Sequence, residues 1–201
     1  MARLTRIEQQ RLTHQRLLEA GRSVLTRRGL LAATVEEIAA EAGYTRGAVY
    51  KHFGGKEGLW LAIMDARAEA YLRMLDEALE QVSDQEELVA ALTPASFADD
   101  ADAARWSRTT AEFAAAMTRL PEITEAAVSS QRRYEEQIIA LLDRHCQRLG
   151  IRPALPLSQA VVLLSVLNTS LALRRGVDPA TDVPAIVANV LAIVFPERGE
   201  R

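Results

Sequence analysis

The first sixty residues place apolar side chains at helical spacing between glycine and threonine residues that can end or begin helices. From about Gln10 to Arg28, apolar or small positions follow one another at spacings of four, three and one residues, as on one face of a helix: Leu17, Gly21, Val24 and Leu25. Arg27 and Arg28 suit the negative end of a helix dipole, and Gly29 suits a left-handed cap. The pattern predicts a first helix that ends near residue 28.

A second, shorter helix is predicted after Thr34. Thr34 and Glu37 form a capping-box pattern, in which each side chain can satisfy a backbone N–H at the start of a helix. Gly43 marks the end of this helix. Its buried face is expected to consist of four apolar residues: Val35, Ile38, Ala39 and Ala42.

A third helix follows almost at once, because Thr45 can cap it and glycine ends it at Gly54. Val49 and Phe53 would lie on its inner side. Two short helices joined by a tight, glycine-containing turn are typical of a helix-turn-helix, in which the second helix is the recognition helix. Gly47 is expected where the two helices approach closely.

The rest of the chain is predicted to be helical throughout. One long helix is expected from Lys56 to about Val82, with five aliphatic residues facing inward: Leu59, Ile63, Leu72, Leu75 and Leu79. Proline residues then divide the chain into helices near 84–92, 100–119, 122–149, 157–175 and 183–195. Strands are not expected, because no alternating runs of Val, Ile and Thr occur between turn signals.

These elements predict an all-α fold of about nine helices. Residues 1–55 would form an N-terminal three-helix domain containing the helix-turn-helix, and residues 56–201 a larger helical domain. Thr93–Asp102 is the most linker-like segment, with one proline and three aspartates.

The net charge changes sign close to the boundary between these two predicted domains. Residues 1–60 carry ten Lys or Arg against six Asp or Glu, a net charge of +4, whereas residues 61–201 carry fourteen against twenty-one, a net charge of −7. A basic end on an acidic body indicates a polyanion partner for the first segment only.

The overall composition, with 49% apolar and 25% charged residues, is that of an ordinary soluble protein. Met1–Gln15 is polar and lacks the order of charged, apolar and small residues that a secretory signal has, so a cytoplasmic protein is expected.

Cys146 is the only cysteine, which excludes an internal disulfide. The preferred interpretation of Cys146 is a plain helix residue, and a sensor or ligand role beside His145 is the alternative.

The run TVEEIAAEAGYTRGAVYKHFGGKEGLW, Thr34–Trp60, strongly resembles the signature of the TetR family of bacterial regulators. The capped second helix, the Ala-Gly turn, the small residue before Tyr-x-His-Phe and the lysine at the next helix start occur in the family's order. The resemblance covers roughly residues 12–62. Tyr44 departs from the usual small aliphatic residue, and Gly21 from the usual alanine at a cost of up to about 1 kcal/mol of helix stability.

The resemblance and the physics of groove recognition together assign the DNA-binding residues. Thr45, Arg46 and Gly47 lie at the end of the recognition helix that enters the major groove. Arg46 is the expected base reader, since arginine can bind guanine O6 and N7 with two hydrogen bonds. Tyr50 lies one turn on, where the resemblance implies a phosphate or base-methyl contact. Lys56, at the next helix start, suits a phosphate oxygen.

Three further residues are expected to contact DNA, and the sequence gives weaker reasons for them. The resemblance implies a phosphate contact for Thr34, although its hydroxyl can equally serve only as a cap. Lys51 and His52 would be supporting contacts. For His52, packing or capping is an equal alternative.

The C-terminal helices predict a dimer. The helices near 157–175 and 183–195 are apolar around most of their circumference and need cover on several sides. Pairing with the same helices of a second subunit would give a four-helix interface, as the family also implies.

The resemblance also places a ligand cavity in the C-terminal domain. Its candidate residues mix apolar bulk with polar groups, and core packing is the alternative for each of them. They are Trp106, Phe113, Met117, Tyr134 and Asn168.

The sequence therefore predicts a repressor that binds a near-palindromic operator as a homodimer and is released by a small-molecule inducer. An activator of the same fold and a helical ligand carrier are alternatives. An enzyme is not expected, because no HExxH, paired cysteines, phosphate-binding glycine loop or Ser/His/Asp set is evident. No catalytic residue, cofactor, metal or membrane partner is predicted.

Overall fold

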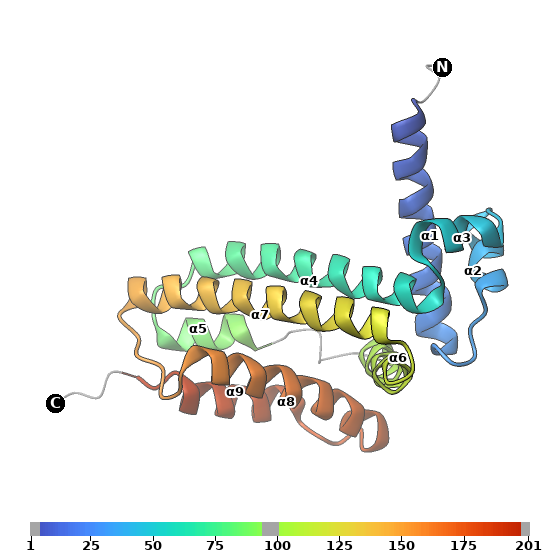
Figure 1. The fold of residues 1–201 in the computed structure, drawn as a ribbon. Helices are drawn as coiled ribbons and strands as arrows, with labels where there is room; N and C mark the ends of the chain where they lie inside the picture. The colour runs from blue at the N-terminus through green and yellow to red at the C-terminus, as the bar shows by residue number, and fades with distance from the viewer. Residues whose placement is uncertain (1–4, 94–100, 198–201) are drawn as a thin grey trace. The chain divides into compact units, whose positions relative to one another are not determined.

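The computed structural model of the protein describes residues 5–93 and 101–197, with residues 101–104 described by their backbone alone. Within these ranges it contains nine helices and no strand (Figure 1), so the predicted all-α fold is confirmed. The segment Thr93–Asp102 lies largely outside the described residues. The helices are α1 (Arg6–Arg28), α2 (Val35–Ala42), α3 (Arg46–Phe53), α4 (Lys56–Glu80), α5 (Gln85–Leu92), α6 (Ala101–Met117), α7 (Pro121–Leu149), α8 (Leu157–Val177) and α9 (Val183–Val194).

Helix α1 begins earlier than the apolar stripe predicted, at Arg6 instead of about Gln10. The reason is a second capping box: the Thr5 hydroxyl accepts from the Glu8 backbone N–H at 3.3 Å, and the Glu8 carboxylate accepts from the Thr5 N–H at 2.7 Å. These two bonds satisfy N–H groups that a helix start otherwise leaves open. The predicted end at Arg28 is confirmed, with Gly29 at a φ of 83°.

The chain divides into two compact units. The first unit contains Met1–Arg67 and Arg108–Ala127, and the second contains Ala68–Ser107 and Val128–Arg201. Helices α4, α6 and α7 each contribute residues to both units. The division into DNA-binding and ligand-binding domains at residue 55 stays a functional prediction.

The core of the first unit is built where α1, α2, α3 and α4 meet. Gly21 of α1 is buried, and a Cβ atom at this position would lie 2.6 Å from Leu59 Cδ2 of α4. The glycine, which costs helix stability, therefore allows a close approach of α1 and α4. The buried side chains around it include Leu17, Val24, Leu25, Ile38, Val49 and Trp60.

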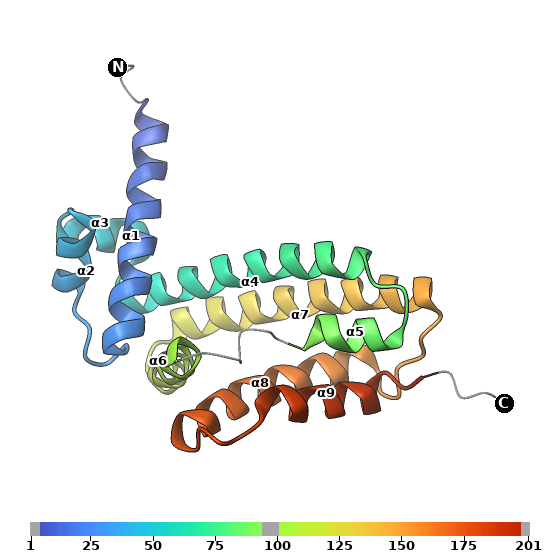
Figure 2. The same ribbon diagram turned by 180° about the vertical axis from the view of Figure 1, so that it is seen from behind.

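The second unit contains the larger hydrophobic core. Helix α8 runs beside α9, and the later turns of α4 run beside α7, as both Figure 1 and Figure 2 show. The Gln85 side chain of α5 donates a hydrogen bond to the Phe195 carbonyl at 2.7 Å, which joins α5 to the end of α9. The most completely buried members of this core are Leu75, Leu79, Leu88, Leu142, Val183, Val187, Leu191 and Phe195.

Helices α8 and α9 also expose apolar side chains. On α8 these residues recur along one side, and α9 adds two more; together they form the α8/α9 apolar stripe: Val162, Leu163, Val166, Leu173, Ile186 and Ile193. Helix α8 is long and apolar enough to cross a membrane by length and composition alone, with 22% of its apolar window buried. A single such helix is weak evidence for a membrane span, and its apolar surface is equally suited to a protein partner.

Candidate nucleic-acid interface

The start of α2 is fixed by the predicted capping box. The Thr34 hydroxyl accepts from the Glu37 N–H at 3.2 Å and lies 3.2 Å from the Glu37 carboxylate, which also accepts from the Thr34 N–H at 3.0 Å. The hydrogen bond from the Thr34 N–H, with smaller contributions from the positive charge of Arg28 and from the Thr34 hydroxyl, holds the pKa of Glu37 below its ordinary value. The Thr34 hydroxyl thus already has one partner as acceptor and one as donor, and its phosphate contact stays a prediction.

The turn between α2 and α3 has the geometry that its glycine predicts. Gly43 lies at φ 73° and ψ 29°, the left-handed conformation that ends many helices. The next N–H, of Tyr44, returns to the Ala39 carbonyl at 2.8 Å. The Tyr44 hydroxyl lies 3.4 Å from the Thr13 hydroxyl of α1, so this unusual residue ties the turn to α1.

Helix α3 divides its side chains as a recognition helix requires. Val49 is fully buried, whereas Arg46, Tyr50 and Lys51 are exposed. Thr45 precedes the helix as its N-cap residue, yet makes no side-chain capping bond, unlike Thr34. Its hydroxyl is therefore available beside the exposed N-terminal turn of α3.

The steric reason predicted for Gly47 is wrong. Gly47 is exposed, and a Cβ atom there would meet only the Thr45 hydroxyl, at an ordinary 3.6 Å. The packing of α2 against α3 therefore does not require glycine at this position. Its predicted place on the DNA-facing side of the helix is unaffected.

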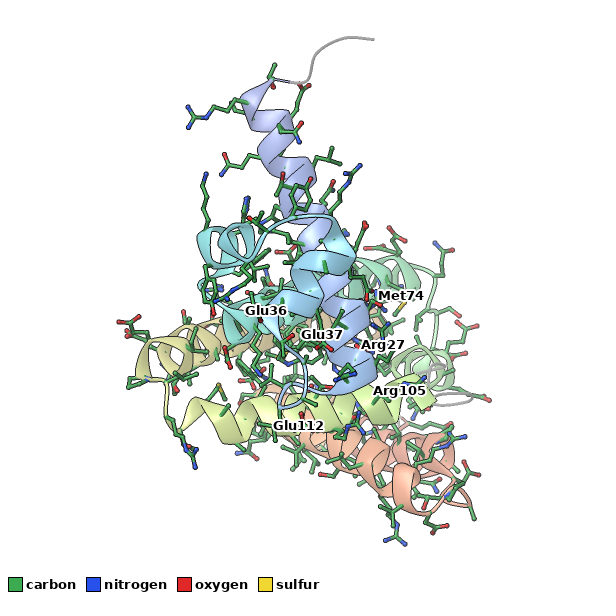
Figure 3. The ribbon with its side chains drawn as sticks, turned by 90° about the vertical axis from the view of Figure 1, so that its right-hand side faces the viewer. Arg27, Glu36, Glu37, Met74, Arg105 and Glu112 are labelled. Atoms are coloured by element: carbon green, nitrogen blue, oxygen red, sulfur yellow. The ribbon has the colours of Figure 1, made fainter. Side chains whose placement is uncertain are left out.

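Arg46 forms an ion pair with the first turn of α2. Its Nε lies 2.9 Å from Oε1 of Glu36, and both side chains are exposed. Figure 3 shows Glu36 and Glu37 at the start of α2. The expected base reader is thus held by an acidic residue for which the sequence analysis predicted no role.

The side chain of Lys56 is hydrogen-bonded within the protein. Its half-buried ammonium donates to the carbonyl oxygens of Leu30 at 2.7 Å and Ala33 at 3.0 Å, in the loop that joins α1 to α2. Two of its three N–H donors are used in this way. A contact of Lys56 with phosphate stays a prediction.

A second side chain holds the same loop. The Glu112 carboxylate of α6 accepts from the Leu31 N–H at 3.1 Å. A Cβ atom at Gly29 would lie 2.8 Å from this carboxylate, so glycine also makes room for it. Figure 3 labels Glu112 on α6. Lys56 and Glu112 together fix the loop that precedes the capped start of α2.

His52 packs towards α1. Its ring centre lies 5.8 Å from that of His14 and 6.0 Å from that of Phe53, while His14 and Phe53 are 4.7 Å apart. Burial lowers the pKa of His14, and the nearby His52 lowers it further. This environment agrees with the packing alternative for His52, although its half-exposed ring leaves a DNA contact open as a prediction.

The N-terminal sequence matches the family described as bacterial regulatory proteins, tetR family, over residues 17–63. A curated relative, the HTH-type transcriptional regulator SrpR of Pseudomonas putida, is 43% identical over 67 residues, which cover 33% of this chain and 31% of SrpR. Over residues 17–63 the chain thus has the N-terminal sequence of the TetR family. The chain spans about a third to a half of the length of the curated relatives that it matches.

Solved structures share the fold of this protein over nearly its whole length. A putative TetR-family regulator from Rhodococcus sp. matches with a TM-score of 0.73 and 17% identity, covering 92% of this chain and 99% of that one. SmeT, the repressor of the Stenotrophomonas maltophilia multidrug efflux pump SmeDEF, has a TM-score of 0.60 and 23% identity, covering 92% and 91%. At these identities the likeness extends to the fold alone.

The five predicted ligand-binding residues of this chain are divided between its two units. Phe113 is buried and Met117 half-buried in the first unit. Trp106, Tyr134 and Asn168 are half-buried in the second unit. Among them, Asn168 carries the clearest polar signal, because its side-chain oxygen is buried without a hydrogen-bond partner among the described residues.

His145 and Cys146 are both buried on α7 of this chain. Burial, with a smaller effect of the negative charge of Asp143, raises the pKa of the Cys146 thiol to about 11. A neutral, buried thiol is a poor nucleophile and a poor metal ligand. This environment supports the interpretation of Cys146 as a plain helix residue.

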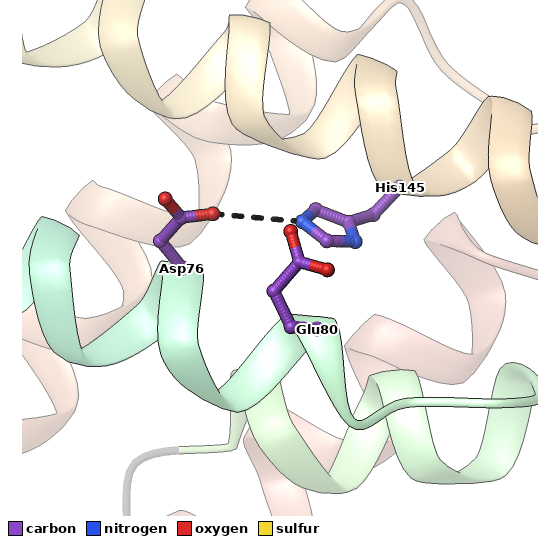
Figure 4. Close-up of side chains that lie close together, drawn as sticks. All are labelled: Asp76, Glu80 and His145. Carbon is purple, nitrogen blue, oxygen red and sulfur yellow. Dashed lines mark ion pairs between the residues drawn. The ribbon is translucent and has the colours of Figure 1, made fainter.

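The His145 ring lies in a charged cluster with Asp76 and Glu80 of α4 (Figure 4). Its Nε2 lies 3.7 Å from Asp76 Oδ1, and its Nδ1 lies 3.2 Å from the Arg148 guanidinium. The Arg144 guanidinium lies 3.4 Å from Nε2, so an arginine faces each nitrogen of the ring. Arg144 also pairs with Asp76. This arrangement favours an ion-pair network over a metal site, because two positive charges beside the ring would repel a cation.

The sequence analysis missed the residues that position the candidate interface. Glu36 acts through Arg46 of α3, and Glu112 acts through Leu31 of the loop before α2. The residue types of Glu36 and Glu112 alone give no signal of these partners. For Glu36 a usable signal exists: it occupies the exposed first turn of a helix that directly precedes the recognition helix.

Proposed function

We propose that this chain is a DNA-binding transcriptional regulator of bacterial cytoplasm, and that it acts as a repressor. The observation that carries the proposal is the two-sided character of α3, which buries Val49 while exposing Arg46, Tyr50 and Lys51. Basic and hydrogen-bonding side chains at the N-terminal end of such a helix are what a major groove binds. The curated relative SrpR, a transcriptional regulator, supports a role in transcription.

The DNA-bound form in this proposal is a homodimer through α8 and α9. The α8/α9 apolar stripe exposes 59% of Val166 and 72% of Ile193. Covering this stripe with the same stripe of a second copy would remove apolar surface from water on both subunits. Two recognition helices would then bind a near-palindromic operator in successive major grooves.

A small-molecule inducer would release the operator. Asn168 supports a ligand-binding role, because a buried oxygen without a donor costs about 1–3 kcal/mol, which a ligand N–H or O–H would recover. Helix α4 begins directly after the helix-turn-helix and continues into the second unit. It is therefore suited to transmit the effect of inducer binding to the DNA-binding helices. Reciprocity requires operator DNA to weaken inducer binding by the same factor.

Selection of genomic fragments by the purified protein tests the DNA-binding role. Wild type and Arg46→Ala would be compared at two salt concentrations. We expect wild type to enrich one near-palindrome and Arg46→Ala to lose that enrichment while keeping its oligomeric state. No enrichment by wild type at either salt concentration would overturn the proposal and leave a ligand carrier as the better account.

The dimer has a separate test with a matched control. Val166→Glu places a charge in the α8/α9 apolar stripe, whereas Val128→Glu places one at an exposed valine of α7 outside it. Sedimentation should show a monomer for Val166→Glu and a dimer for Val128→Glu and wild type. Equal masses for the two variants would contradict an interface at this stripe.

A further inference from the structure

We infer that Glu36 is a positioning residue that orients Arg46 for a guanine in each operator half-site, an inference that rests on the proposed DNA-binding function. Glu36 is the second residue of α2 and Arg46 the first residue of α3. Their ion pair, at 2.9 Å, connects the starts of the two helices across the turn. The side chains of Glu36 and Arg46 remain 55% and 62% exposed, so a DNA duplex can reach the pair.

The atom through which Arg46 is held matters. A guanidinium has five N–H donors in a planar fork, and two of them can bind O6 and N7 of guanine in parallel. Glu36 approaches Nε, at the stem side of the group. The edge formed by the two terminal nitrogens is the edge opposite this stem, and it can bind guanine while the carboxylate keeps the plane of the group fixed.

The pair also explains an acidic residue on a surface meant for a polyanion. A carboxylate there weakens the attraction to every phosphate, whatever the sequence. Glu36 combines this general repulsion with a specific effect, because it holds Arg46 in the orientation that guanine requires. Loss of Glu36 therefore has opposite consequences: stronger binding to unrelated DNA and weaker discrimination at one base pair.

Neighbouring acidic residues of α2 do not share this role. The Glu37 carboxylate is engaged by Thr34 and lies 3.3 Å from Arg28. Glu41 pairs with Arg27 of α1 at 2.9 Å, through a similarly exposed arginine. The Arg27–Glu41 pair has the same chemistry as the Arg46–Glu36 pair and does not involve α3, so Glu41 provides a matched control.

The test begins with the near-palindrome that wild type selects, so a failure of the proposed function appears first, as the absence of any selected sequence. Dissociation constants are then measured for that duplex, for its single-base variants at every half-site position and for an unrelated duplex. The proteins are wild type, Glu36→Ala, Glu36→Gln, Glu41→Ala, Arg46→Ala and the double variant of Glu36 and Arg46. Thermal unfolding of each checks its fold, and Glu36→Gln replaces Glu36→Ala if the latter does not fold.

Wild type should prefer guanine at one half-site position by on the order of 10- to 100-fold. Glu36→Ala should lose most of this preference at that position alone, should bind unrelated DNA more tightly, and should have no further effect on preference in the Arg46→Ala background. Glu41→Ala should share the tighter unrelated binding but keep the preference. The inference is overturned if Glu36→Ala keeps the wild-type preference, or if it weakens binding equally at every position.

Discussion

The ammonium of Lys56 donates to the carbonyl oxygen of Leu30 at 2.7 Å, across a sequence separation of 26 residues. With its second bond to the Ala33 carbonyl, Lys56 joins the start of α4 to the loop before α2. A lysine that the family resemblance places on phosphate thus also has a structural role. It holds the loop that precedes the capped start of α2.

Replacement of Lys56 by methionine should therefore destabilise the fold. Hydrogen bonds from charged groups contribute about 1.5–3 kcal/mol each, so a loss of a few kcal/mol in the free energy of unfolding is expected. Lys51→Met is the control, because Lys51 is exposed on α3 and has the same charge. Urea unfolding measures both variants, and equal stabilities would show that the Lys56 bonds contribute nothing.

Three glycine-to-alanine variants should differ in a predictable order. At Gly58 the new Cβ would clash with the backbone carbonyl oxygen of Phe53, and at Gly21 it would lie 2.6 Å from Leu59 Cδ2. Overpacking typically costs about 1–3 kcal/mol, and a backbone atom can yield less than a side chain. Gly47→Ala meets only a 3.6 Å contact, so it should gain up to about 1 kcal/mol from helix propensity.

Thermal or urea unfolding of these variants tests the order. Gly58→Ala is expected to be the least stable, Gly21→Ala intermediate and Gly47→Ala at least as stable as wild type. A Gly21→Ala protein more stable than wild type would contradict the close approach of α1 and α4 described above.

Lowering the pH should reduce the stability of the first unit, because His14 becomes protonated. Burial lowers the pKa of His14 below its ordinary 6.5, so the unfolded chain takes up a proton at a higher pH than the folded one. Above pH 6.5 both states are neutral and His14 has no effect. As the pH falls below that value and through the folded pKa, stability is lost.

The His14→Gln variant isolates this effect. Its stability should fall less than that of wild type between pH 8 and pH 5, as measured by urea unfolding at each pH. The nearby His52 should reinforce the wild-type loss, since two charged imidazoles would repel each other. Identical pH profiles for the two proteins would exclude His14 as the source.

Cys146 should react slowly in the folded protein. Burial and Asp143 raise its pKa to about 11, so almost no thiolate is present at pH 8. Alkylation by iodoacetamide should therefore be much slower than that of an unstructured peptide thiol and should reach the peptide rate in urea. A native rate equal to the peptide rate would mean that the thiol is not buried and that its pKa is not raised.

The helices were predictable because their signals are local. Thr34 with Glu37 and the glycines after α2 and α3 fix helix ends through neighbouring backbone groups. The start of α1 was missed because its capping box, at Thr5, precedes the apolar stripe from which the helix was inferred. A local signal was present there as well, but no buried residue accompanied it.

The positioning of the candidate interface was not predictable in the same way. Glu112 reaches Leu31 across 81 residues, and no pattern within α6 indicates that partner. The ligand-binding candidates share a further difficulty: Phe113 is buried as any core aromatic would be, so its residue type cannot distinguish packing from ligand binding. Only Asn168, through its unpaired buried oxygen among the described residues, gains a physical reason from the structure.

Amide hydrogen exchange with and without the selected duplex tests the central claim most directly, because it locates the DNA-binding surface without any substitution. A duplex of the same length and unrelated sequence is the control. We predict that the selected duplex slows exchange in the first turns of α2 and α3, at residues 34–38 and 45–50, more than the control duplex does. Slower exchange elsewhere with no change at these two helix starts would contradict the assignment of this surface to DNA.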